Sequence, residues 1–180
     1  MRVIAGVARG QPLVAPRDPG TRPITDRVKE TLFAILGERV PEARVLDLYA
    51  GSGAIGIEAL SRGAASATFV ERARPALVAL RTNLERTRLA DLASVHALDV
   101  ERFLGGAAGS TWTLVFLDPP YEVRDIVAPL RAVEPLLAPD AMIVIKHFWR
   151  TELPQVAGLQ AVRQRRFGET MLSFLEAPGR

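Results

Sequence analysis

The tetrapeptide Asp118-Pro119-Pro120-Tyr121 follows a short apolar run and combines a carboxylate, two prolines and an aromatic ring. The prolines fix the backbone and lack N–H donors, so carbonyl and carboxylate oxygens dominate beside the ring. Such an acceptor-only pocket suits a planar group with an exocyclic amino group. Its two hydrogens would bond to the Asp118 carboxylate and the Pro119 carbonyl, while Tyr121 stacks on the ring. We therefore predict that Asp118, Pro119, Pro120 and Tyr121 form a catalytic pocket for an amine.

A glycine-rich turn at residues 47–56 forms a second motif, between a predicted strand and a predicted helix. Gly51, Gly53 and Gly56 satisfy the pattern G-x-G-x-x-G, in which glycines permit a tight turn and close approach of a ligand. Glu71 lies 20 residues after Gly51 and ends the next predicted strand, where it can accept hydrogen bonds from ribose hydroxyls. The spacing predicts a nucleoside-bearing cofactor, and NAD would satisfy it.

Asp47 favours a cofactor other than NAD. This carboxylate lies four residues before Gly51, where it would repel a pyrophosphate but attract a cationic or amino-bearing ligand. S-adenosylmethionine carries a sulfonium and an ammonium but no phosphate, and the turn resembles the first motif of the class I methyltransferases. On that resemblance Glu71 would hold the ribose and Asp99 would meet the adenine amino group. The predicted cofactor-binding residues are Asp47, Ala50, Gly51, Ser52, Gly53, Gly56, Glu71, Arg72, Asp99 and Val100.

Strands and helices are predicted to alternate around these motifs, from apolar runs and from apolar residues at helical spacing. Strands are expected at 45–49, 67–71, 95–98, 112–117 and 141–145, and helices from 25 or 26 to 37 or 41, at 54–61, from 75 onward and near 126–137. Segments 159–167 and 171–176 predict an antiparallel hairpin. The fold class is thus α/β, with a doubly wound, mostly parallel seven-stranded sheet of the Rossmann-like methyltransferase type. Ligands of such sheets bind at the carboxyl ends of the strands.

The N-terminal segment differs from the rest of the chain in charge. Residues 1–29 carry six basic and two acidic residues, whereas the net charge of the whole chain is +3. Segments 2–5 and 12–15 predict a hairpin. We predict a basic β-hairpin extension over residues 1–24 and a methyltransferase domain over residues 25–180. The guanidinium groups suit a polyanionic partner.

The tetrapeptide resembles the (Asn/Asp)-Pro-Pro-(Tyr/Phe) motif of amino-group methyltransferases. The stretches 2–13, 21–33 and 167–174 resemble the RsmD family, which methylates guanine N2 in bacterial 16S ribosomal RNA. The resemblance implies S-adenosylmethionine as cofactor and 16S rRNA, within the small ribosomal subunit or an assembly intermediate, as partner. The predicted RNA-binding residues are Arg2, Arg9, Arg22, Arg27 and Lys29. The chain departs from the family at Ile24, where we expect Thr, and at Lys146, where we expect an acid.

Other functions remain open at this point. An adenine-N6 DNA methyltransferase would usually carry a separate target-recognition domain, for which the chain is short. A protein glutamine methyltransferase would be expected to have Asn in place of Asp118. An NAD-dependent reductase is disfavoured by Asp47 and by the lack of a Tyr-x-x-x-Lys pair. A non-catalytic RNA-binding module would not need the tetrapeptide.

The composition excludes several classes of chemistry. The chain has no cysteine, which excludes disulfides, cysteine-based zinc sites and the thiolate route to C5 of pyrimidines. With two histidines and no cysteine, no transition-metal site is expected. No apolar run is long enough for a membrane span or a signal peptide. We expect a cytoplasmic monomer that has no contact with membranes.

Overall fold

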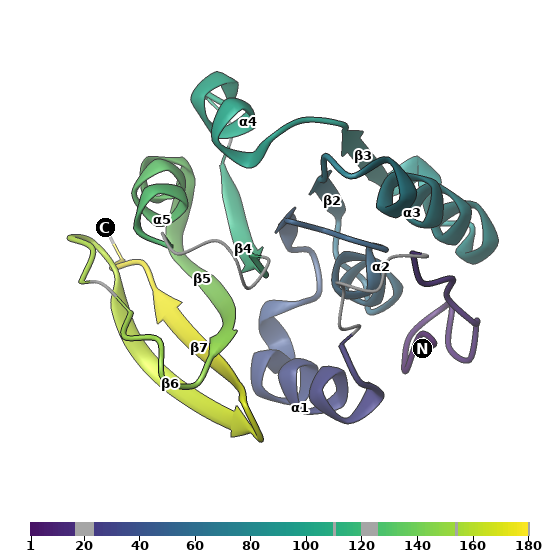
Figure 1. Ribbon diagram of the computed structural model, residues 1–180, viewed down its shortest axis with the longest axis horizontal. Helices are drawn as coiled ribbons and strands as arrows, with labels where there is room; N and C mark the ends of the chain where they lie inside the picture. Colours follow the sequence, from purple (N-terminus) through teal and green to yellow (C-terminus); the bar gives the residue numbers. More distant parts are fainter. Residues whose placement is uncertain (17–23, 110, 120–125, 154, 180) are drawn as a thin grey trace.

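The computed structural model describes residues 1–16, 24–109, 111–119, 126–153 and 155–179. Its centre is one seven-stranded sheet with the strand order β3-β2-β1-β4-β5-β7-β6 (Figure 1). The strands are β1 (Arg44–Leu48), β2 (Ser66–Val70), β3 (Ala93–His96), β4 (Trp112–Leu117), β5 (Leu137–Phe148), β6 (Gln160–Phe167) and β7 (Thr170–Glu176). The first five strands pair in parallel, and β7 pairs antiparallel with both β5 and β6. The predicted sheet and its C-terminal hairpin are confirmed.

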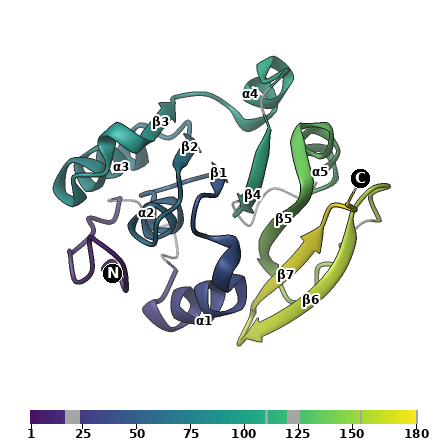
Figure 2. The ribbon, with the colours of Figure 1, turned by 180° about the vertical axis from the view of Figure 1, so that it is seen from behind.

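Helices cover both faces of the sheet (Figures 1 and 2). They are α1 (Asp26–Leu36), α2 (Ala54–Ser61), α3 (Arg74–Thr87), α4 (Val100–Gly106) and α5 (Val127–Val133), with 3-10 turns at Gly37–Arg39, Ala90–Leu92 and Glu134–Leu136. Successive side chains of a strand point to opposite faces, so the sheet builds two apolar clusters. One cluster contains residues of α1, α2 and α3, and the other contains residues of α4 and α5.

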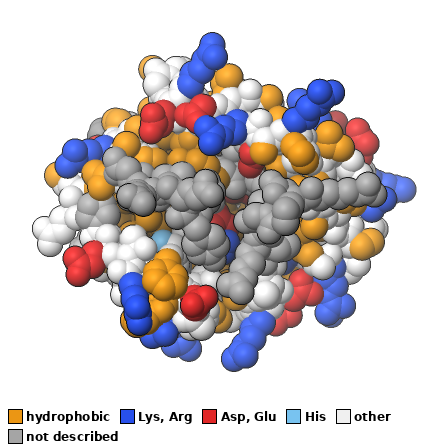
Figure 3. All heavy atoms as spheres, in the orientation of Figure 1, with side chains coloured by type: hydrophobic (Ala, Val, Ile, Leu, Met, Phe, Trp, Pro, Cys, Tyr) orange, Lys and Arg blue, Asp and Glu red, His pale blue; other side chains and the backbone are white. Residues whose placement is uncertain are grey.

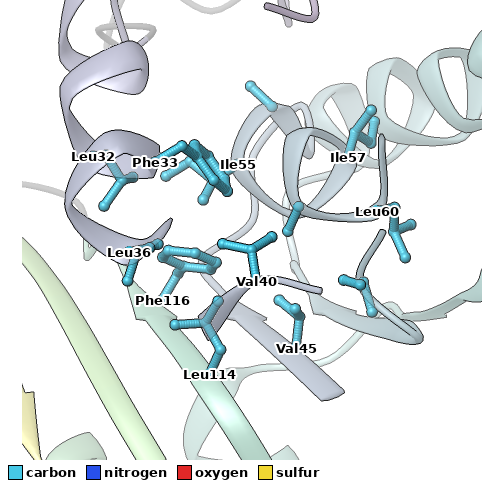
Figure 4. Close-up of a cluster of buried hydrophobic side chains, with 14 of the residues drawn as sticks. Leu32, Phe33, Leu36, Val40, Val45, Ile55, Ile57, Leu60, Leu114 and Phe116 are labelled. Carbon is cyan, nitrogen blue, oxygen red and sulfur yellow. The ribbon is translucent and has the colours of Figure 1, made fainter. Parts of the chain in front are cut away.

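Helix α1 is fixed on the sheet by its caps and its apolar face. The Thr25 hydroxyl accepts a hydrogen bond from the Val28 N–H at 3.3 Å, which satisfies a free donor of the first turn. Gly37 ends the helix with φ 49°. The rings of Phe33 and of Phe116 from β4 have centroids 6.1 Å apart within the cluster drawn in Figure 4. The buried aromatic pair therefore joins the helix to the strand that precedes Asp118.

Strand β3 begins and ends two residues before the predicted 95–98, and three other regions differ more from the sequence prediction. Helix α4 was not predicted, and it is a seven-residue helix that ends in two glycines. Strand β5 begins at Leu137, which the prediction placed in the preceding helix. The N-terminal hairpin contains a single antiparallel bridge between Arg2 and Pro12. A longer ladder does not form because the N–H groups of Ile4 and Ala5 donate to a side chain of α2.

That side chain is Glu58, which is fully buried. Its carboxylate accepts the N–H groups of Ile4 at 2.8 Å and Ala5 at 3.0 Å. It also pairs with Lys29 at 3.2 Å and with Arg62 at 2.8 Å. These four donors compensate the buried charge, which would otherwise be costly. Glu58 thus ties the N-terminal segment to α2 and, through Lys29, to α1. In the described part of the chain no helix is long and apolar enough to span a membrane.

Candidate active site

Four carboxylates gather at the carboxyl ends of neighbouring parallel strands. Asp47 lies in β1, and Glu71, Asp99 and Asp118 follow the ends of β2, β3 and β4. Because these four strands are parallel, their carboxyl ends meet at the same edge. The pKa of Asp47 is raised well above its ordinary range, first by burial and then by the charges of Asp118 and Glu71. The four carboxylates therefore lie at the carboxyl ends of parallel strands, where ligands of such sheets bind.

Asp47 lies beneath the glycine-rich turn and supports it. Its side chain is 1% exposed, and its Oδ2 accepts the N–H of Gly56 at 3.0 Å. A Cβ on Gly56 would lie 2.3 Å from Phe69, so only glycine allows this close approach. The prediction that Asp47 faces the ligand directly is therefore revised, because its carboxyl is turned into the protein and acts on the turn.

The turn itself has a left-handed backbone at Gly53, with φ 77°. A Cβ at this position would lie 2.2 Å from Leu80 of α3, so both conformation and packing require glycine. At Gly51 a Cβ would meet nothing within 4 Å. The turn is thus closed against α3 at Gly53 and open at Gly51, where a ligand can approach its backbone.

Glu71 holds the other side of this opening. Its Oε2 accepts the N–H of Gly51 at 2.9 Å, and its Oε1 accepts the N–H groups of Arg72 and Ala73 at 2.8 and 2.7 Å. A carboxylate has about four acceptor positions. One position therefore remains for a hydroxyl group, which is the contact predicted for a ribose.

Arg72 and Asp99 form an ion pair with an N–O distance of 3.2 Å across the same opening. Their side chains are 73% and 45% exposed, and exposed pairs of this kind are weak and easily opened. Asp99 also accepts the Glu101 N–H at 3.0 Å and thereby caps α4. The predicted adenine contact at Asp99 would keep this cap and open the pair with Arg72.

Besides Asp47, Gly53 and Gly56, three more of the predicted cofactor residues are buried. Ala50 is 9% and Val100 is 3% exposed, and both belong to the apolar clusters. Ser52 is 9% exposed, and its carbonyl accepts a hydrogen bond from Asn83 at 2.9 Å. The Ala50 and Val100 side chains pack into the core, and the contact of these residues with a cofactor stays a prediction.

Asp118 forms a two-point ion pair that the sequence did not reveal. The Nζ of Lys146 donates to Oδ1 at 2.9 Å and to Oδ2 at 2.8 Å. The side chain of Asp118 is 27% exposed and that of Lys146 is 13% exposed. Burial raises the pKa of Asp118, and the charge and hydrogen bonds of Lys146 oppose that rise. Pro119 is partly exposed beside Asp118, whereas the predictions for Pro120 and Tyr121 lie outside the described residues.

Tyr49 is a second feature that the sequence prediction missed. It precedes Ala50 in the glycine-rich turn and has φ 60°, a left-handed conformation that costs a non-glycine residue about 1–2 kcal/mol. Burial raises its pKa, and the charges of Asp99 and Glu101 raise it further. Backbone strain of this kind gathers at ligand sites. An aromatic residue between Asp47 and Gly51 was the signal available in the sequence.

The N-terminal basic residues fall into different environments. Arg2, Arg9 and Arg27 are exposed, and Arg2 pairs with Asp26 at 3.3 Å. Arg22 lies outside the described residues. Lys29 is wrong as an RNA-binding residue, because it is 0% exposed and its ammonium pairs with Glu58.

The groups around Gly51 and Glu71 fit S-adenosylmethionine by their chemistry. The described residues offer two carboxylates, Glu71 and Asp99, and one arginine that is already paired. Hydroxyl groups, an amino group and a sulfonium suit this set better than a pyrophosphate does. The open backbone at Gly51 gives the ligand room. No cluster of metal-ligating side chains occurs among the described residues.

The chain is similar to known proteins over nearly its whole length. Residues 1–176 match the family described as "Conserved hypothetical protein 95". The chain is 39% identical to "Putative rRNA methyltransferase YlbH" of Bacillus subtilis, over 99% of this chain and 100% of the relative. It is 38% identical to "Ribosomal RNA small subunit methyltransferase D" of Escherichia coli K12, over 87% and 79% of the two chains. The solved structure "Putative methyltransferase yhhF from Escherichia coli" superposes with a TM-score of 0.87 at 36% identity, covering 100% of this chain and 99% of that one.

Proposed function

Since the chain belongs to the family described as Conserved hypothetical protein 95, the RsmD family, we propose that it methylates 16S ribosomal RNA on the exocyclic N2 of a guanine, with S-adenosylmethionine as the methyl donor. The observation that carries the proposal is the Asp118 carboxylate at the carboxyl end of β4, next to the glycine-rich turn at the end of β1. This placement supports the proposal, because a carboxylate that could accept an amino group lies beside the turn proposed to bind the cofactor.

Asp118 would orient the guanine amino group. The carboxylate has about four acceptor positions, and Lys146 occupies one on each oxygen. The remaining positions can accept an N–H of the amino group. The amino lone pair is delocalised into the ring, so acceptors on its hydrogens favour a pyramidal nitrogen with the lone pair aimed at the methyl group. Orientation and electrostatics then supply the catalysis, and no covalent intermediate on the protein is needed.

Lys146 would keep Asp118 in the form that accepts hydrogen bonds. A protonated carboxyl would place an O–H opposite the N–H of the substrate, whereas the ammonium favours the ionised carboxylate. Bound S-adenosylmethionine supplies a methyl group activated by the positive sulfur. The nitrogen that takes the methyl group would carry a surplus proton, which Asp118 would accept and pass to water. The Pro119 carbonyl and Tyr121 are proposed as the second acceptor and the stacking surface.

The cofactor would bind at the opening between Gly51 and Glu71. Glu71 has one acceptor position left for a ribose hydroxyl, and Asp99 is available for the adenine amino group once its exposed pair with Arg72 opens. Arg2, Arg9 and Arg27 would contact phosphates of the RNA. Arg22 stays in this proposal on charge alone.

The experiment is methyl transfer from labelled S-adenosylmethionine to small ribosomal subunits that lack the modification, followed by digestion to nucleosides. We expect N2-methylguanosine from the unaltered chain. The variant Asp118→Ala should lose at least a hundredfold in turnover while its S-adenosylmethionine affinity, measured by calorimetry, stays within about twofold, because Asp118 acts on the amine. Label in adenosine, in protein or in no product would contradict the proposal.

A further inference from the structure

Strand β6 forms one outer edge of the sheet and is strongly basic. The strand order ends with β7-β6, and residues 160–166 are all exposed. The segments 146–152 and 160–170 together carry five basic and two acidic residues. Charge on an outer strand also prevents strands of other molecules from pairing there. That role requires neither arginine specifically nor an aromatic neighbour, and this edge has both.

Two guanidinium groups lie against the ring of Trp149, which directly follows β5. The Cζ atom of Arg166 is 3.8 Å from the ring centroid, and that of Arg150 is 4.7 Å away. Arg166 also donates from Nε to the carbonyl of Gly168 at 2.7 Å. The ring and this carbonyl hold the Arg166 side chain in one orientation, so less conformational freedom is lost when a ligand binds to it. We call Trp149, Arg150, Arg163, Arg165 and Arg166 the arginine edge.

The arginine edge lies near the carboxyl ends of β5 and β6, on the same side of the molecule as the carboxyl end of β4, where Asp118 lies. Lys146 of β5 and Arg165 of β6 are both in register with Leu172 of β7. Two strand spacings of about 4.8 Å therefore separate their backbones, or roughly 10 Å. Lys146 in turn contacts Asp118. A polymer with one residue at Asp118 can thus reach the arginine edge within a few repeats.

The surface view agrees with this placement. Figure 3 shows basic side chains beside hydrophobic ones at the lower left of the face, where Figure 1 places β6. Arg163 and Arg165 share one face of the strand, and Arg166 points to the other face, toward Trp149. Positive charge is therefore presented on both sides of the edge.

We propose that the arginine edge binds the RNA strand next to the target nucleotide, with phosphates on Arg163 and Arg165 and a base stacked on the Arg166 guanidinium. This inference rests on the proposed function. RNA fits better than an acidic peptide because guanidinium groups bind phosphate in a two-point geometry, and because unpaired bases of RNA stack on aromatic rings and on arginine planes. The surface thus combines one contact for the backbone and one for the base.

The first test measures how RNA binding depends on salt. Unmodified 16S rRNA transcript is titrated with the full chain at several salt concentrations, and the slope of log Kd against log salt is compared between variants. The double variant Arg163→Gln/Arg165→Gln should lower the slope by about 0.7 for each arginine, because each lost phosphate contact releases fewer counterions. The matched control is Arg81→Gln/Arg86→Gln. This control removes two exposed arginines from α3, which lies beside β3 and far from β6 in Figures 1 and 2. It should leave the salt slope of RNA binding unchanged.

The second test separates stacking from charge. Trp149→Ala removes no charge but frees the Arg166 side chain, so it should weaken RNA binding about tenfold at an unchanged salt slope. Each variant is also titrated with S-adenosylmethionine, and unchanged affinity for the cofactor shows that the fold is intact. An unchanged salt slope in the double arginine variant, or unchanged affinity in Trp149→Ala, overturns the inference.

The two proposals fail in different ways. If the unaltered chain produces no methylated guanosine in RNA, the proposed function fails. If it methylates RNA and the arginine-edge variants bind naked transcript like the unaltered chain, only this inference fails. Weaker binding to the small subunit, with unchanged binding to naked rRNA, would assign the arginine edge to a ribosomal protein and also overturn the inference.

Discussion

The two-point pair between Lys146 and Asp118 makes a strong prediction about pH. Two unit charges about 3 Å apart attract by about 5 kcal/mol at an effective dielectric constant of about 20, and desolvation offsets roughly half of that. The distances of 2.8 and 2.9 Å and the low exposure of both side chains justify this estimate. The remainder, about 2–3 kcal/mol, corresponds to roughly a 30- to 150-fold change in the ratio of ionised to protonated carboxyl.

The variant Lys146→Met removes the charge and keeps an unbranched side chain of similar length. Burial then raises the pKa of Asp118 without opposition, so the protonated form persists to higher pH. We expect the acid limb of the kcat/KM profile to move upward by about 1.5–2 pH units. Activity should therefore fall most at the acid end of the pH range and approach the original value at the alkaline end. Lys146→Arg keeps the charge and should leave the acid limb in place.

The control is Arg39→Met, which breaks an ion pair with Glu176 on an exposed part of the chain. It should leave the pH profile unchanged. The assay is single-turnover methyl transfer to small subunits between pH 5.5 and 9.5, with cofactor affinity measured at each pH. An acid limb that stays in place in Lys146→Met refutes the reasoning. A loss that is equal at every pH also refutes it, because it would mean that Lys146 only supports the fold.

Three further variants test the structure in urea denaturation. Gly53→Ala should cost about 2–4 kcal/mol, because the left-handed backbone and the 2.2 Å approach to Leu80 both exclude a Cβ; a stable variant would show that the turn can rearrange. Lys29→Met should cost about 3–5 kcal/mol, because it leaves the buried Glu58 short of a donor, and should not change the salt slope of RNA binding. The pKa of Asp47 is raised in the folded chain, so wild-type stability falls as the pH rises from the unfolded value near 3.9 toward the folded one. Asp47→Asn should therefore stabilise the chain more at pH 8 than at pH 4, and an equal effect at both pH values would contradict this.

The central strands were predictable because each is a run of apolar residues bounded by turn residues. The stretches 45–48 and 114–117 are buried on both faces of the sheet, and such runs have little alternative to a central strand. The end of the helix after Ile126 was not predictable in the same way. Leu137 fits the helical spacing, but pairing with Trp112 of β4 places it in β5. Tertiary pairing thus overrides a local pattern that allows either structure.

The error at Lys29 had a visible signal. Lys29 is three, four and seven residues before Leu32, Phe33 and Leu36, so helical spacing places it on the buried face of α1. Its charge concealed this, because lysine is seldom buried without a partner. The partner, Glu58, is on another helix, and a single sequence does not connect the two. The pair between Asp118 and Lys146 escaped prediction for the same reason.

Helix α2 connects the proposed binding site for the cofactor with the proposed binding site for the RNA. It begins directly after Gly53, at the turn that would receive the cofactor, and its later residues Glu58 and Ser61 hold the N-terminal segment that would receive the RNA. All eight of its residues are buried, so a displacement at one end of the helix is transmitted through packed contacts to the other end. Any RNA-induced displacement of the N-terminal segment would therefore also displace the glycine-rich turn. Thermodynamic reciprocity then requires that the factor by which RNA changes the cofactor dissociation constant equals the factor by which the cofactor changes that of RNA.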